Sequence, residues 1–170
     1  MHTLQYIAIR SEDKEAAANS VKNLLEEELN PGHSWYDWFV VGGGRFADGE
    51  DNQYEDTHET VIAYADTPDL YNEVVAECME KRGREFQELL TEFKQSETNL
   101  VNMFENYKGG IEFSMDLYSV KKMIDIMQGA WDYTSRLYDI ENWSTNTHHM
   151  NRSLADGNKD WFLVPIDFHF

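Results

Sequence analysis

The fold depends on residues 35–46, which read WYDWFVVGGGRF. Aromatic and β-branched residues fill most of the first seven positions, and this composition is typical of a β-strand. Gly42, Gly43 and Gly44 then end the strand, because residues without a Cβ atom permit a sharp turn, a bulge or the close approach of another backbone. A strand of this kind needs neighbouring strands, and the flanking sequence supplies them.

On the N-terminal side, residues 3–10 alternate in the manner of a strand. Ser11 is a suitable N-cap, and apolar residues then recur at helical spacing as far as Leu29. Residues 30–32, Asn-Pro-Gly, end this first helix. The chain therefore opens with a strand followed by a helix.

On the C-terminal side, residues 60–65 predict a third strand. Thr67 and Pro68 begin a long helix, with proline at its first position, and the apolar stripe of this helix continues to about Lys94. Residues 100–107 predict a further short helical piece.

The last third of the chain contains both the alternation of a strand and the spacing of a helix. Residues 111–117 predict a short extended segment, which passes into a helix that runs to about Tyr138. The polar residues 142–160 predict a loop. Residues 161–170 predict a closing strand, and Pro165 favours an edge position or a strand end for it, because proline cannot donate a ladder hydrogen bond.

In order, these elements predict a single α+β domain over residues 1–170. Its expected core is a ferredoxin-like split βαβ sheet with additional helices inserted before the last strand. A chain of 170 residues with 41% hydrophobic residues can bury one such core without disulfides.

The charge balance narrows the class of partner. Thirty-two acidic residues against fourteen basic ones give a formal net charge of −18. A surface of this kind repels nucleic acid and attracts basic proteins at rates that fall with added salt. The alternative is that the acidity serves only solubility.

The compartment expected from the sequence is the cytoplasm. Cys78 is the single cysteine, so neither a disulfide framework nor a cysteine zinc cluster is expected within one chain. The first ten residues lack the pattern of a signal peptide, and no apolar run is long enough for a membrane span. We expect no cofactor and no membrane contact.

The most informative segment for partner binding runs from Phe46 to Glu80 and contains no Lys or Arg. Six of its carboxylates fall in the loop between the second and third strands, where a dense array could occupy a surface that normally binds DNA phosphates. A solvated loop gives the same pattern, and the spacing does not match a calcium-binding EF-hand. These residues are Asp48, Glu50, Asp51, Glu55, Asp56 and Glu59.

A second acidic array is predicted further along the chain. Asp125, Asp132 and Asp139 are spaced by seven residues, which would place them along one face of a helix. Lys121 and Lys122 interrupt the neighbourhood, and an ordinary solvent-facing helix is the alternative.

A catalytic or ligand-binding alternative centres on the glycine turn. Asp167 and His169 are two residues apart on the predicted last strand, so they share a face and could form an acid/base pair. Arg45 follows the glycines, but the turn lacks the pattern of a phosphate-binding loop, so backbone geometry is the favoured explanation. His148 and His149 form no metal-binding pattern, and we expect no metal site and no enzyme.

The aromatic strand allows a third alternative. Its alternation places Trp35 and Phe39 on one face and Tyr36 and Trp38 on the other, so one pair could be exposed. Exposed aromatics often form a partner surface, which leaves a homodimer open.

Residues 35–46, together with the closing Asp167-Phe168-His169-Phe170, resemble a group of small bacteriophage proteins that share an aromatic strand running into a Gly-Gly-Arg-aromatic turn. In size and acidity the chain also resembles the phage inhibitors that mimic DNA, a family that includes the staphylococcal phage Twort inhibitor of the bacterial DNA sliding clamp. This resemblance implies a non-enzymatic inhibitor that occupies the DNA channel of the clamp and stops host DNA replication. The acidic residues named above would then face basic residues of the clamp, and residues 97–160 have no counterpart in the family pattern.

Overall fold

The computed structural model describes residues 1–27, 35–47, 54–95 and 115–170 of the chain. Within these ranges the protein is α+β, with four α-helices and a mixed, open sheet of five strands. The elements in chain order are β1 (His2–Arg10), α1 (Lys14–Glu27), β2 (Trp38–Val41), the 3₁₀ helix η2 (Gly44–Phe46), β3 (Ile62–Ala63), α2 (Pro68–Gln95), α4 (Met115–Gln128), β4 (Leu137–Asp139), α5 (His148–Ala155) and β5 (Trp161–His169).

The sheet has the strand order β2-β5-β1-β4, and β3 pairs with the same side of β5 as a separate short segment. β1 and β5 pair antiparallel over nine residue pairs, from His2 opposite His169 to Arg10 opposite Trp161. β1 pairs parallel with β4, so the sheet is mixed. The predicted ferredoxin-like split βαβ arrangement is not confirmed.

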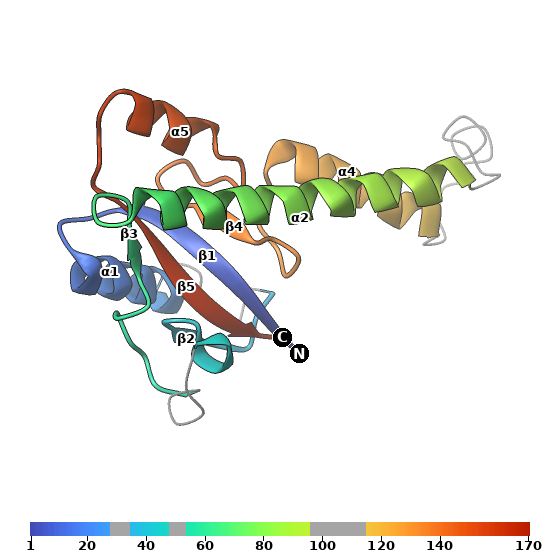
Figure 1. Cartoon of the computed structure of the whole chain (residues 1–170). Coiled ribbons are helices and arrows are strands. Elements are labelled where there is room, and N and C mark those ends of the chain that lie inside the picture. The colour runs from blue at the N-terminus through green and yellow to red at the C-terminus, as the bar shows by residue number, and fades with distance from the viewer. Residues whose placement is uncertain (28–34, 48–53, 96–114) are drawn as a thin grey trace.

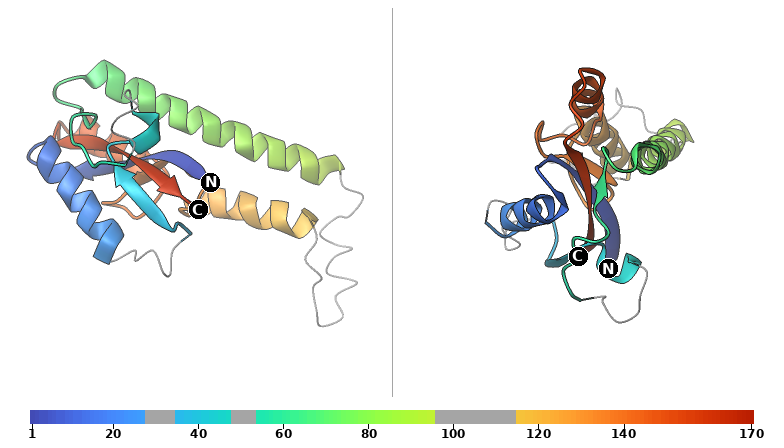
Figure 2. Two further views of the ribbon diagram at one scale, coloured as in Figure 1. Left: turned by 90° about the horizontal axis from the view of Figure 1, so that it is seen from below. Right: turned by 60° about the vertical axis from the view of Figure 1, so that its left-hand side comes forward.

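Helices cover both faces of this sheet (Figure 1). α1 packs on one face and α2 on the other, as the right-hand view in Figure 2 shows. α5 contributes Met150 to the same core cluster as α2. Because β5 lies in the middle of the sheet beneath both layers, its residues from Trp161 to Phe168 are all buried. A near-continuous apolar run is typical of a strand that is buried on both faces.

The prediction that the last strand lies at a sheet edge, or that Pro165 lies at a strand end, is wrong. Pro165 lies between the part of β5 that pairs with β3 at Leu163 and the part that pairs with β2 from Ile166 onward. Its carbonyl accepts a hydrogen bond from the Gly42 N–H at 2.7 Å. In an antiparallel ladder the N and O atoms of one residue point to the same neighbour, so the missing proline N–H would face Gly42. The Gly42 carbonyl instead accepts a hydrogen bond from Thr60 Oγ1 at 2.9 Å, and no ladder partner is lost.

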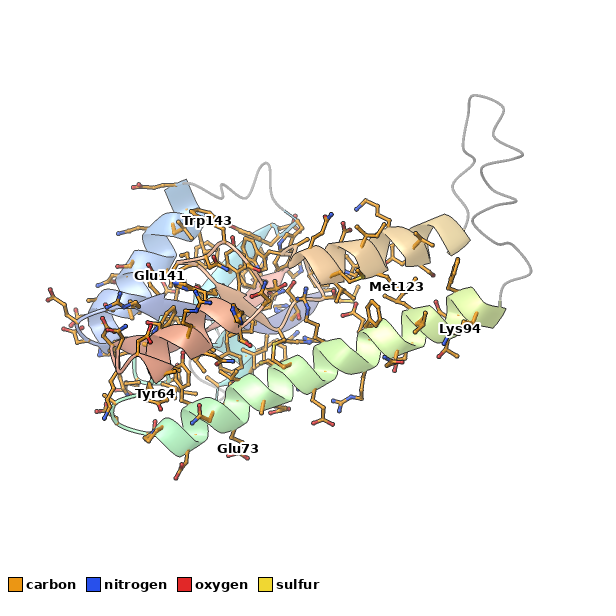
Figure 3. The ribbon with its side chains drawn as sticks, turned by 90° about the horizontal axis from the view of Figure 1, so that it is seen from above. Tyr64, Glu73, Lys94, Met123, Glu141 and Trp143 are labelled. Atoms are coloured by element: carbon orange, nitrogen blue, oxygen red, sulfur yellow. The ribbon has the colours of Figure 1, made fainter. Side chains whose placement is uncertain are left out.

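α2 begins at Pro68, as the sequence predicts, and extends well beyond the sheet (Figures 1 and 2). α4 runs beside its far half, and the buried Met123 of α4 lies between the two helices (Figure 3). Arg82 of α2 donates a hydrogen bond from Nη2 to the Ile126 carbonyl at 2.9 Å, which ties the pair together. Glu73 and Lys94 point away from this contact (Figure 3).

Two other local predictions are wrong. The helix expected to run to Tyr138 ends at Gln128, because Gly129 adopts a positive φ of 76° that terminates a helix. Residues 137–139 instead form β4 at the edge of the sheet. The loop expected over residues 142–160 contains the helix α5, whose buried Met150 packs on the sheet together with Leu154, four residues later. The predicted short helix at 100–107 lies outside the described residues.

No helix among the described residues combines the length and the apolar character that crossing a membrane requires.

Candidate functional site

The strand register brings two histidines and a tryptophan together at one end of the sheet. His169 of β5 lies opposite His2 of β1 on one side and opposite Trp38 of β2 on the other. The Trp38 and His169 rings are stacked, with centroids 5.0 Å apart and an interplanar angle of 10°. The His2 ring meets both of them edge to face, at 5.2 Å from Trp38 and 5.0 Å from His169. We call His2, Trp38, His169 and the adjoining Asp167 the histidine cluster.

Asp167 is the buried anchor of the histidine cluster. Its side chain has no solvent exposure, and its Oδ1 lies 2.9 Å from Nδ1 of His2. Its Oδ2 accepts a hydrogen bond from the backbone N–H of Arg45 at 3.2 Å. An ionised carboxylate can only accept hydrogen bonds, so beside ionised Asp167 it is Nδ1 of His2 that carries the proton in this contact. In the neutral ring, Nε2 of His2 is therefore the nitrogen with the free lone pair.

The glycine turn gives the backbone access to Asp167. Gly44 has a φ of +46°, and a Cβ atom there would lie 2.8 Å from both Cβ and Oδ2 of Asp167. Any larger residue would therefore push η2 away and break the Arg45 N–H contact. The glycines therefore allow the close approach of the backbone, as the sequence suggested. The Arg45 side chain itself is exposed.

His169 has a buried ring nitrogen that faces an exposed carboxylate. Its Nδ1 is buried and forms no hydrogen bond with the described residues, but it lies 3.3 Å from Oδ2 of the exposed Asp37, within ion-pair distance. Asp167 and His169 thus both contact His2, but they do not form the direct acid/base pair suggested by the sequence.

A cleft of 420 Å³ opens between β1 and α2, with His2 in its wall. This volume falls within the range of small-molecule sites, roughly 300–1,000 Å³. Its lining combines apolar and aromatic groups with charged ones. The lining residues are His2, Thr3, Leu4, Tyr6, Phe46, Glu77, Cys78, Lys81 and Arg136.

Cys78 is not the reactive group of this cleft. Burial raises the pKa of its thiol to about 11, so the thiolate is scarce at neutral pH. Its Sγ donates toward the Arg136 carbonyl at 3.6 Å, which is consistent with the core position that the sequence predicts.

The residues of the first predicted acidic array differ in their surroundings. Glu55 and Glu59 are exposed, as a partner-binding role would need. Asp56 has an internal role, since it accepts hydrogen bonds from the Val41 N–H at 2.8 Å and from Lys22 Nζ at 2.7 Å. Asp48, Glu50 and Asp51 lie outside the described residues.

The second predicted array does not lie on one helix face. Asp125 is on α4 and pairs with Lys121 at 2.7 Å, Asp132 follows the end of α4, and Asp139 is buried in β4. The prediction failed because Gly129 ends the helix between the first two residues.

Asp132 and Asp139 are both held by internal contacts. Burial disfavours the ionised form of Asp132, but hydrogen bonds from the buried Lys122 and from Thr134 outweigh it and hold the pKa of Asp132 below its ordinary value. For Asp139, burial dominates and raises the pKa, although His149 Nδ1 lies 3.0 Å from its Oδ2.

Sequence reasoning missed His2 and Trp38 as members of the site. The signal that could have found them is the pairing of the first and last strands in antiparallel register, which sets the N-terminal histidine beside the C-terminal Asp-Phe-His sequence. Among the described residues, no group of three or more His, Cys, Asp or Glu side chains is arranged to hold a metal ion.

Comparisons with known proteins identify no relative. No protein-family model, no curated protein and no solved structure matches this chain.

Proposed function

We propose that this chain is a small-ligand-binding protein whose site is the cleft between β1 and α2, with His2 as its acid–base group. The observation that carries the proposal is the pairing of His2 with the fully buried Asp167 in the wall of a 420 Å³ cleft. A buried carboxylate behind a histidine fixes the tautomer and orientation of the ring. His2 can then offer its second nitrogen to a ligand as a hydrogen-bond acceptor or proton acceptor.

Two further features support a binding role for this end of the sheet. The stacked Trp38 and His169 rings form a rigid wall behind His2, so the ring has little freedom to turn away. His169 is also held from its other side, where Oδ2 of Asp37 lies 3.3 Å from its Nδ1.

The experiment is a fragment screen that reads the rise in melting temperature on ligand binding. Compounds that stabilise the wild type are then titrated against Asp167→Asn, in which the amide can donate to His2 and reverse its tautomer. We expect an affinity loss of about tenfold or more. Asp37→Asn is the matched control, because it removes an exposed carboxylate next to His169 and leaves His2 and Asp167 untouched. A set of ligands that bind the wild type and Asp167→Asn equally would place binding elsewhere and refute the proposal.

A second candidate is the binding of a basic host protein, and the observation that favours it is the net charge of −18. In this proposal the chain is a phage-encoded, non-enzymatic DNA mimic that acts in the bacterial cytoplasm and occupies the DNA channel of the sliding clamp. The exposed Glu55 and Glu59 are its described contact residues, and Asp48, Glu50 and Asp51 would extend the surface. Asp56, Asp125 and Asp132 are already paired with Lys22, Lys121 and Lys122, so they carry less weight as contact residues in this proposal.

This second candidate is tested with purified clamp. Glu55→Lys with Glu59→Lys should weaken a salt-sensitive association, because both changes reverse exposed charges. Glu73→Lys, on the outward side of α2, is the control for a general charge effect (Figure 3). Absence of any association at low salt would refute the candidate.

A further inference from the structure

The charge of the cleft is opposite to that of the whole chain. Its charged lining consists of Lys81 and Arg136 against the single carboxylate of Glu77, while the chain as a whole has more than twice as many acidic as basic residues. Exposed charges are screened over about 8–10 Å at physiological salt, so a ligand inside the cleft experiences these local groups more strongly than the distant acidic surface.

Cations also gather just beyond the cleft. Lys81 and Arg136 line a second cavity of 260 Å³, where Arg84 joins them with Glu85 and Glu88. Lys81 and Arg136 therefore line both cavities, while Arg84 lines the second cavity and pairs with Glu80.

The two cations of the cleft remain available to a ligand. Arg136 donates from Nη1 to Thr3 Oγ1 at 2.8 Å and forms no ion pair with the described carboxylates. A guanidinium has five N–H donors, and among the described residues Thr3 accepts from one of its nitrogens. Lys81 pairs with Glu77 one turn earlier on α2 at 2.7 Å, and a surface pair of this kind is weak enough to rearrange.

We propose that the ligand of this cleft is a small phosphate-bearing molecule whose phosphate is held between Lys81 of α2 and Arg136 at the start of β4. This inference rests on the proposed function, since it names the ligand class of the same cleft. A phosphate group carries about −1.5 to −2 charge at pH 7, which suits two cations that lie on facing elements. Tyr6 and Phe46 line the same cleft and supply aromatic surface for the rest of the ligand, which extends toward His2.

The probes are phenyl phosphate, inorganic phosphate and phenol, titrated into the full chain and followed by backbone amide NMR shifts. We expect saturable binding of phenyl phosphate, weaker binding of inorganic phosphate and no saturable binding of phenol. Arg136→Gln should weaken phenyl phosphate binding by about tenfold or more, and Lys81→Gln should weaken it severalfold.

Two controls separate binding from folding. Arg136→Lys should recover part of the affinity lost in Arg136→Gln. Arg152→Gln removes an exposed cation of α5 and should change nothing.

The results distinguish this inference from the proposed function. Phenol binding as tightly as phenyl phosphate, or unchanged phenyl phosphate affinity in Arg136→Gln, overturns the phosphate assignment. The proposed function would still stand if the compounds that bind the cleft lost affinity in Asp167→Asn. Phenyl phosphate binding that depends on Arg136 but not on Asp167 supports the phosphate site and removes the role of His2. Absence of saturable binding by both phosphates overturns the inference.

Discussion

Nδ1 of His2 lies 2.9 Å from Oδ1 of Asp167, although 165 residues separate the two along the chain. The contact exists because β1 and β5 pair in a register that sets Leu4 opposite Asp167 and His2 opposite His169. It joins the candidate site to the central strand pair, so the geometry of the site and the stability of the sheet depend on each other.

The first prediction concerns this pair. His2→Ala leaves the buried Asp167 without its histidine partner and should lower the free energy of unfolding by about 2–3 kcal/mol. Asp167→Asn should suppress this effect, because no buried charge then remains to be compensated. Urea unfolding of the two single variants and the double variant measures the coupling. Additive losses would show that the two side chains do not interact.

The second prediction concerns the glycine turn. Gly44→Ala combines a left-handed φ with a Cβ atom 2.8 Å from Asp167, so we expect a loss of about 2 kcal/mol and weaker ligand binding. Gly83→Ala is the matched control, since it lies in α2 with no atom within 4 Å of the added Cβ. That change should stabilise the protein by about 0.5–1 kcal/mol. Equal effects of the two substitutions in thermal unfolding would contradict this account.

The third prediction concerns Asp132 and Lys122. Lys122 is buried and donates to Asp132 and to Thr134 Oγ1, so Asp132→Asn should cost about 3 kcal/mol by leaving an uncompensated buried charge. Asp125→Asn removes the exposed pair with Lys121 and should cost less than about 0.5 kcal/mol.

This pair also predicts a pH dependence. The pKa of Asp132 is lowered in the folded state, so its stabilising contribution is present above the ordinary value near pH 4 and is lost as the pH falls through the lower folded pKa. The difference in stability between wild type and Asp132→Asn should therefore shrink below about pH 4. A difference that stays constant in acid would refute the assignment.

The fourth prediction concerns Asp139, whose contribution to stability changes with pH in the opposite direction to that of Asp132. Burial raises the pKa of Asp139, so its protonated form favours folding, and that contribution is lost as the pH rises from about 4 through the raised folded pKa. Asp139→Asn stays neutral and can still accept hydrogen bonds from the N–H groups of Glu141 and Asn142. Its stability relative to wild type should therefore rise between pH 4 and pH 7 in urea unfolding.

Asp160 provides the control for this pH experiment. The Arg10 guanidinium holds the pKa of Asp160 below its ordinary value. The stability of Asp160→Asn relative to wild type should therefore fall, or stay level, as the pH rises. A parallel trend in the two variants would point to a general charge effect and away from the burial of Asp139.

Local sequence patterns predicted the first strand and helix, the start of α2 at Pro68 and the close approach of the backbone at the glycine turn. Each depends on neighbouring residues: strand alternation, helical periodicity, a proline at the first helical turn and the absence of Cβ atoms. The end of α4 and the helix α5 were also readable in principle, from Gly129 and from Met150 and Leu154 at helical spacing. Their short or mixed patterns were outweighed by the longer periodicity to Tyr138 and the polar composition of residues 142–160.

Only the tertiary structure decided the central position of β5 and the membership of the histidine cluster. Pro165 is tolerated inside the sheet because the neighbouring strand position is divided between β2 and β3. The Gly42 carbonyl that faces Pro165 accepts a hydrogen bond from Thr60. His2, Trp38, Asp167 and His169 meet because three strands from distant parts of the chain share one register. Periodicity determines which residues of a segment share a face, but the partner of each strand is set by how all the elements bury their apolar surfaces together.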